Sequence, residues 1–216
     1  MRTILSCGLV LTMSVLSSSL CLAEDFPEDT NKIKSLTAEQ AADLVMVVTH
    51  VRKKNDIDLF NLASINKDVA QELAKFKGRL NLGLTSIDKD VAQELAKFKG
   101  SLTLKALTSI EKDVAQELAK FKGGTLTLNG LTSIDKDVAK ELLKYKGHLW
   151  LMGLTSIDKD VAQELAKFEG QHINILGSDS LDEVVQAYLM SNYRITLYEP
   201  RPPKGKKDLI FGRPLQ

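Results

Sequence analysis

Apolar and polar positions repeat along this chain with a period of about 23 residues. Five segments share nearly the same apolar spacing, each a variant of LTSIDKDVAQELAKFKG, and they begin at Leu62, Leu84, Leu107, Leu131 and Leu154. The starts lie 22, 23, 24 and 23 residues apart. Such a period is typical of a solenoid, because a unit of this size buries its apolar face only by stacking on copies of itself.

Each unit contains two periodicities. Val91, Leu95 and Phe98 lie at i, i+4 and i+7, which predicts a short helix of about ten residues with one apolar face. Asp88 is expected to cap the start of this helix, and Gly100 to end it in a left-handed conformation. After each glycine an alternating run such as LTL predicts a strand with its leucines facing inward.

The pattern LxLxxLTSI followed by a helix resembles the leucine-rich repeat, in particular short bacterial forms in which LTSI or VTSI follows the strand. The resemblance implies an α/β solenoid with a parallel β-sheet on the concave side and short helices on the convex side. One departure is that leucine occupies the turn, where the usual repeat carries Asn or Cys. We expect the Thr and Ser that follow to supply the missing hydrogen bonds, in the pairs Thr85 and Ser86, Thr108 and Ser109, Thr132 and Ser133, and Thr155 and Ser156.

The flanks extend the same plan to seven strands. Residues 24–61 are expected to form an N-terminal capping helix and a first strand, and residues 62–177 the five repeats. Residues 178–198 match a degenerate C-terminal repeat. Residues 199–216 form a basic, Pro-rich tail with three expected alternatives: a solvated extension, a cover for the last repeat through Leu209–Phe211, or a docking segment for an acidic surface.

Residues 1–23 have the pattern of a cleaved secretory signal, with a basic start, an apolar stretch and the small Ala23 before an acidic segment. An uncleaved anchor and a lipoprotein signal are the alternatives. Cleavage after Ala23 leaves 193 residues without cysteine and with equal numbers of basic and acidic side chains. We therefore expect an exported protein, located in the periplasm, on the cell surface or in the medium, that is held together by packing alone.

Charge and composition narrow the function classes. Lys and Arg number 29 against 28 Asp and Glu, so no global positive field favours nucleic acid. Aromatic residues make up 6% of the chain, which leaves few candidate anchors on a surface. Carboxylates recur at equivalent helix positions, and we expect them to form columns on a solvated convex face, partly compensated by lysines, and not a catalytic pair.

The helical string KDVAQELAKFKG is identical in three units, whereas the outward strand residues vary from unit to unit. Two outward columns are expected, one of them Asp58, Asn81, Thr103, Thr127, Trp150, Asn174 and Thr196, the other Asp56, Arg79, Ser101, Thr125, His148 and His172. A constant scaffold with a variable face is what a binding module needs. Drift after recent duplication would produce the same contrast.

The sharpest cluster on this face combines His148, Trp150 and Met152 with His172 and Asn174 on the next strand. Together with Thr127, Thr103 and Asn81, these residues are the predicted partner-binding site. Trp150, the single Trp, is either an interface anchor or a side chain packed across neighbouring strands or under the tail. Two imidazoles without a carboxylate or thiolate make a poor metal site, so no metal or cofactor is expected.

No nucleophile elbow, phosphate-binding glycine loop or zinc motif appears, and enzyme activity is not expected. The first hypothesis is therefore an exported, non-enzymatic module whose concave strand face binds a protein or glycan partner. The alternative is a structural or self-associating cell-envelope protein without a defined ligand. Neither hypothesis includes nucleic acid, or stable membrane insertion once the signal has been cleaved.

Overall fold

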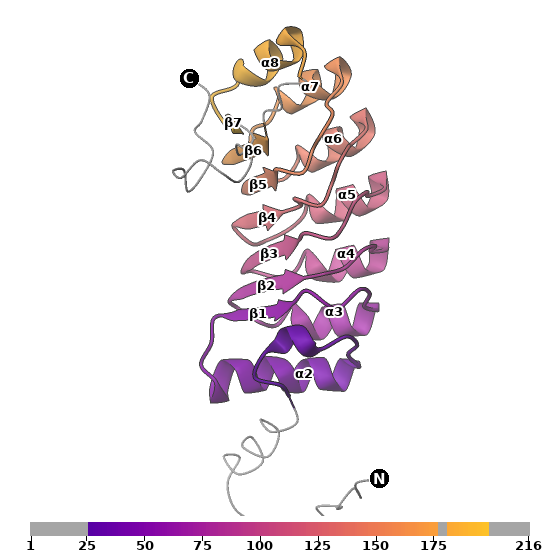
Figure 1. Cartoon of the computed structure of the whole chain (residues 1–216), viewed down its shortest axis with the longest axis vertical. Helices are drawn as coiled ribbons and strands as arrows, with labels where there is room; N and C mark the ends of the chain where they lie inside the picture. Colours follow the sequence, from indigo (N-terminus) through magenta and orange to yellow (C-terminus); the bar gives the residue numbers. More distant parts are fainter. Residues whose placement is uncertain (1–25, 177–180, 199–216) are drawn as a thin grey trace, which may run out of the picture.

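Seven parallel strands form one open sheet whose order follows the sequence, with helices packed along one side (Figure 1). The structure is a computed structural model that describes residues 26–176 and 181–198. Its strands are β1 (Asp56–Leu59), β2 (Arg79–Leu82), β3 (Ser101–Leu104), β4 (Thr125–Thr127), β5 (His148–Leu151), β6 (His172–Leu176) and β7 (Ile195–Tyr198). The predicted α/β solenoid of regular strand–helix units is confirmed.

The helices follow the strands in alternation. They are η1 (Thr30–Lys32), α2 (Ala38–Met46), η2 (Val47–Val51), α3 (Lys67–Leu73), α4 (Lys89–Leu95), α5 (Lys112–Leu118), α6 (Lys136–Leu142), α7 (Lys159–Leu165) and α8 (Glu183–Met190). The N-terminal α2 begins with a capping box between Thr37 and Gln40, and η2 continues it as a π-helical turn. No helix in residues 26–176 and 181–198 is long and apolar enough to cross a membrane.

The repeat helices begin as predicted and end earlier than predicted. The Asp88 carboxylate accepts a hydrogen bond from the Val91 amide at 2.8 Å, and Asn66, Asp135 and Asp158 cap their helices in the same way. The helix after Asp88 has seven residues, not ten, and its C-cap Ala96 is right-handed. The prediction of a left-handed Gly100 was wrong, since no glycine in the described part of the chain has a positive φ.

Gly100 is required for a different reason, which is the close approach of neighbouring units. A Cβ atom on Gly100 would lie 1.8 Å from the Gly78 carbonyl oxygen and 2.6 Å from the Phe98 ring. Gly123 makes the equivalent approach to the Gly100 carbonyl oxygen, at 2.0 Å. Gly78, Gly100 and Gly123, here called the glycine column, therefore let the strands that follow them start directly against the backbone of the preceding unit.

The core lies between the sheet and the helices and is built from two ladders. Inward strand leucines are fully buried in each unit, for example Leu80, Leu102 and Leu126. A second ladder of rings runs along the ends of the helices, with centroids of Phe98 and Phe121 6.3 Å apart and those of Phe121 and Tyr145 5.9 Å apart. Because Tyr145 is buried, its hydroxyl needs a partner and donates to the Gly123 carbonyl at 2.9 Å.

The prediction of solvated carboxylate columns holds for the aspartates, with the side chains of Asp137 and Asp160 61% and 63% exposed, but it was wrong for the glutamates of the inner units. Glu94, Glu117 and Glu141 are buried at 4%, 7% and 8% exposure. Each is paired with the lysine three residues later, at 2.7, 2.8 and 2.5 Å, so the predicted compensation is present. Stacking of helix on helix covers the glutamates of the inner units, whereas the lysine heads extend into solvent.

The expected Thr and Ser ladder is formed only in part. The Thr85 hydroxyl donates to the Ala63 carbonyl at 3.4 Å, and the Thr155 hydroxyl donates to the Thr132 carbonyl at 3.2 Å. Backbone amides make most of the contacts between turns, as when the Thr155 amide donates to the Thr132 carbonyl at 2.9 Å. The turns of successive units therefore satisfy each other mainly through the main chain.

Candidate functional site

The sheet face that turns away from the helices, here called the strand face, carries both predicted columns. The register pairs Thr103 with Thr127, Thr127 with Trp150, and Trp150 with Asn174. It likewise pairs His148 with His172. The outward positions were therefore assigned correctly from the period of two along each strand.

The strand face is hollowed into a groove of about 750 Å³ that runs from β2 to β7. Hydroxyl, amide and imidazole groups predominate along it. Its lining consists of Arg79, Asn81, Ser101, Thr103, Thr125, Thr127, Asn129, His148, Trp150, His172, Asn174 and Tyr198. Seven of the eight predicted partner-binding residues thus line one groove, whereas Met152 lies in the turn after β5 and is not part of the lining.

Trp150 packs across neighbouring strands toward the last strand of the sheet. Its ring and that of Tyr198 are stacked, with centroids 6.5 Å apart and planes inclined by 21°. Trp150 belongs to β5 and Tyr198 to β7, so the pair spans β6 diagonally: Asn174 is the partner of Trp150 in the register, and Leu176 is the partner of Tyr198. Both rings stay half-buried, and Asn174 is only 4% exposed. We call Trp150, His172, Asn174 and Tyr198 the aromatic cluster.

The two histidines of the groove differ in environment. His148 is exposed, whereas His172 is half-buried and its Nε2 lies 2.6 Å from the Thr196 hydroxyl. Burial, and secondarily the charge of neighbouring His148, lowers the pKa of His172 below its usual 6.5. The groove end therefore carries an imidazole that favours the neutral form. Within the described residues no group of three or more metal-binding side chains is brought together.

The remaining predicted residues lie farther along the groove. Thr103 and Thr127 occupy its half-buried centre, and Asn81 donates from its amide to the Asp58 carboxylate at 2.6 Å. Sequence reasoning missed Asn129, whose side-chain oxygen accepts from the Met152 amide at 3.0 Å. This hydrogen bond joins the turn after β4 to the turn after β5. Asn129 lies two residues after Thr127, and this outward spacing was the available signal.

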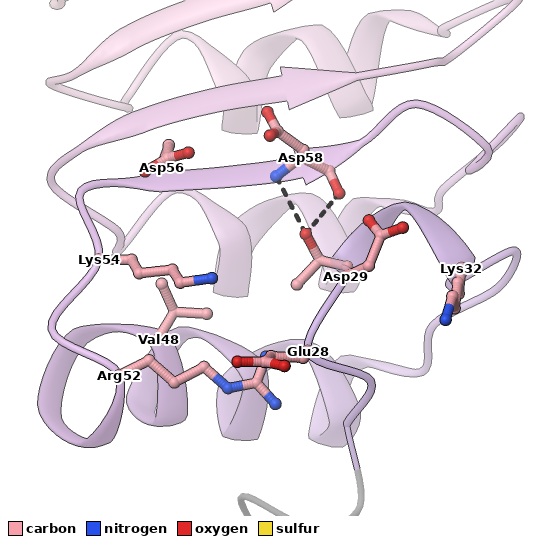
Figure 2. Close-up of a pocket in the computed structure, with 9 residues that line it drawn as sticks. Glu28, Asp29, Lys32, Val48, Arg52, Lys54, Asp56 and Asp58 are labelled. Atoms are coloured by element: carbon pink, nitrogen blue, oxygen red, sulfur yellow. Dashed lines mark hydrogen bonds between the residues drawn. The ribbon is translucent and has the colours of Figure 1, made fainter.

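A second hollow lies at the opposite end of the sheet, beside β1. Figure 2 shows charged side chains from β1, from η1 and the residues before it, and from the segment after η2, gathered around this pocket of about 450 Å³. Glu28, Asp29, Lys32, Val48, Arg52, Lys54, Asp56 and Asp58 line it together with Thr30. The four acidic residues face three basic ones, so the pocket is close to electrically balanced. No sequence pattern had pointed to this pocket.

Hydrogen bonds inside this N-terminal pocket fasten the chain start to the edge of the sheet. The Thr30 hydroxyl donates to the Asp58 carbonyl at 2.6 Å and accepts from the Asp58 amide at 3.2 Å, as the dashed lines of Figure 2 mark. The Asn31 side chain accepts from the Phe60 amide at 3.0 Å. The Arg52 guanidinium donates to the carbonyls of Phe26 and Pro27 at 2.7 and 2.8 Å. The polar groups at this end therefore close a free strand edge.

Comparisons with known proteins add no family assignment. No protein-family model matches the chain, and no curated protein matches it significantly. Structure and sequence together thus establish regular strand–helix repeats with one seven-strand parallel sheet.

Proposed function

We propose that this protein is an exported, non-enzymatic binding module of the leucine-rich-repeat type that recognises a protein or glycan partner through its strand face. The observation that carries the proposal is the contrast between the two sides of the solenoid. The helices repeat one sequence, with KDVAQEL recurring in α3, α4, α5 and α7, while the groove lining changes from strand to strand. Repeat solenoids use such extended faces for binding.

Partner recognition is supported by the composition of the groove. A half-buried Trp and Tyr at one end provide the amphipathic aromatic area that interfaces favour. The residues between the aromatic cluster and β2 add hydroxyl and amide groups, which fix orientation without requiring charge compensation. Export rests on the signal-like residues 1–23, which lie outside the described residues.

Photo-crosslinking in intact cells of the native host tests the proposal. A photoreactive residue at Thr127, beside Trp150 in the register, is expected to form adducts that disappear when Trp150→Ala is added. The matched control places the same group at Lys140, an exposed residue of the helix that follows β4. Equal adducts at Lys140, or none at Thr127, would contradict the proposal.

A self-associating envelope protein is the second candidate, and the C-terminal unit favours it. Val184, Met190 and Tyr193 are exposed at 47%, 49% and 83%, and they are the large apolar side chains of the described residues that face solvent. Sedimentation of the purified protein over a hundredfold concentration range tests this candidate. Association that disappears in Val184→Lys with Met190→Lys would support it, and a concentration-independent monomer would exclude it.

A further inference from the structure

The aromatic cluster contains an amide group, that of Asn174, without a hydrogen-bond partner among the described residues. Asn174 is only 4% exposed. No hydrogen bond joins its carboxamide to another group in residues 26–176 or 181–198, yet no side-chain atom there is both fully buried and unpartnered. The amide atoms are therefore accessible from the groove, where they can form hydrogen bonds with a ligand.

An amide in this position is matched by a ligand that both donates and accepts hydrogen bonds. The carboxamide offers two N–H donors and one carbonyl acceptor within a few ångströms. A largely buried carboxamide without a partner is unfavourable. A ligand that bonds both its N–H donors and its carbonyl oxygen therefore gains more binding free energy than from the same hydrogen bonds made in open water. Neighbouring hydroxyl groups of a sugar ring have this donor and acceptor pattern.

The two rings supply the complementary apolar surface. Trp150 and Tyr198 lie nearly parallel, 6.5 Å between centroids, and Trp150 is the direct neighbour of Asn174 in the register. The negative face of an aromatic ring attracts the weakly positive C–H bonds of a pyranose, whose ring face is flat and apolar while its rim is polar. A ring surface beside a buried amide therefore matches both parts of a sugar residue.

The charge of the groove favours an uncharged ligand. The chain as a whole is 26% charged, but among the described residues the groove lining contains a single permanently charged side chain, Arg79, on β2 at the end remote from β7. Near the aromatic cluster the titratable groups are His148 and His172, and the second is held toward its neutral form. A charged ligand would gain no counterion at this end of the groove.

We propose that the aromatic cluster binds a neutral sugar residue of a glycan, stacked on Trp150 and Tyr198, with its hydroxyl groups paired to the Asn174 amide. This inference rests on the proposed function, because it names the chemical class of partner for the same face. A polypeptide would need a pocket for an apolar side chain or a complementary charge, and the lining offers hydroxyl, amide and imidazole groups instead.

The test uses the purified full chain and an array of neutral oligosaccharides built from glucose, N-acetylglucosamine, galactose and mannose. Trp150 is the only tryptophan, so its fluorescence reports binding at the cluster directly. At least one oligosaccharide is expected to bind and to shift the emission of Trp150. Asn174→Leu and Tyr198→Ala are each expected to weaken that binding by about tenfold or more.

Two control variants keep the result specific. Tyr198→Phe retains the ring and is expected to restore most of the affinity that Tyr198→Ala loses. Lys140→Gln, at an exposed position of α6 outside the groove lining, is expected to change the affinity by less than roughly threefold. Thermal unfolding of every variant confirms that it is folded. Binding that survives Asn174→Leu and Tyr198→Ala would overturn the inference.

Failure of this inference is distinguishable from failure of the proposed function. If no neutral oligosaccharide shifts the Trp150 emission, while Thr127 still forms Trp150-dependent adducts with a protein in cells, the sugar assignment is wrong and the binding face stands. If the array and the crosslinking are both negative, the proposed function fails as well.

Discussion

The two ends of the strand face use polar residues in opposite ways. At β1 the side chains of Thr30 and Asn31 hydrogen-bond the backbone of the strand edge, and Asn81 is paired with Asp58. At β5 to β7 the Asn174 amide is nearly as buried as a core residue and has no such partner within the described residues. The first arrangement stabilises the fold, whereas the second leaves without a protein partner the amide that we propose binds a ligand. Substitutions at the two ends should therefore change stability with opposite signs.

The largest effect is expected at the N-terminal pocket. Thr30→Val combined with Asn31→Ala removes three hydrogen bonds to Asp58 and Phe60, so the free energy of unfolding should fall by about 2–3 kcal/mol. Urea unfolding followed by circular dichroism measures the change. Thr103→Val, at the centre of the same face, is the matched control and should change stability by less than about 0.5 kcal/mol. Equal effects of the two variants would remove the distinction between the ends.

Asn174→Leu is expected to raise the free energy of unfolding, by about 1 kcal/mol, because an apolar group of similar size replaces a largely buried side chain whose amide makes no hydrogen bond to the described residues. Asn81→Leu is the contrasting variant and should lower stability, since Asn81 bonds Asp58 at 2.6 Å. Urea unfolding of both proteins makes the comparison. A loss of stability in Asn174→Leu as large as in Asn81→Leu would show that Asn174 serves the fold.

In the middle of the solenoid, the N-cap of α5 is expected to give a change of intermediate size in the free energy of unfolding. Glu111 stands at the N-cap of α5 without a side-chain capping bond, and Asp113 accepts from the Val114 amide instead. Glu111→Asp restores the residue that caps α4 and should add about 0.5–1 kcal/mol to the free energy of unfolding. The reverse change, Asp88→Glu, should subtract a similar amount. An unchanged thermal midpoint in both variants would contradict the capping argument.

The smallest expected change in stability is a dependence on pH that arises from His172 of the aromatic cluster. Burial lowers the pKa of His172, so the folded protein holds the neutral imidazole more strongly than the unfolded chain does. Stability from this source is present above the unfolded value of about 6.5 and is lost as pH falls below it. The urea midpoint of the wild type should decline relative to that of His172→Gln between pH 7.5 and 5.5. Parallel midpoints across that range would show that His172 is not buried in the folded state.

The repeat period predicted most of the fold because its rules are local. Alternation along each strand placed Trp150 beside Asn174, and the residue before each helix predicted the caps. The glycine of each unit was wrongly predicted to be a left-handed helix cap. It is required by a close contact with a residue about 22 positions earlier, and the sequence at the end of the helix does not show such a contact. Burial of Glu94 was missed for a similar reason, since neighbouring helices provide the cover.

The candidate site was predicted in part. The outward columns included Trp150, His172 and Asn174, and the variable face singled them out. Tyr198 was missed because it lies at the end of the last strand, one position beyond the LTL-like core, and meets Trp150 only diagonally across β6. The charged N-terminal pocket escaped sequence reasoning because η1 precedes the repeats and its contacts reach β1 across 28 residues.

The glycine column also fixes how closely one repeat unit packs against the next. Gly100 meets Gly78 as Gly123 meets Gly100, so these two successive junctions between units have the same contact. Duplication of one unit by recombination would therefore insert a complete rung, with both of its junctions already matched, and would move the aromatic cluster about 4.8 Å farther from the N-terminal pocket. Duplication can thus lengthen the solenoid by whole repeat units, without any change to the N-terminal pocket or to the aromatic cluster.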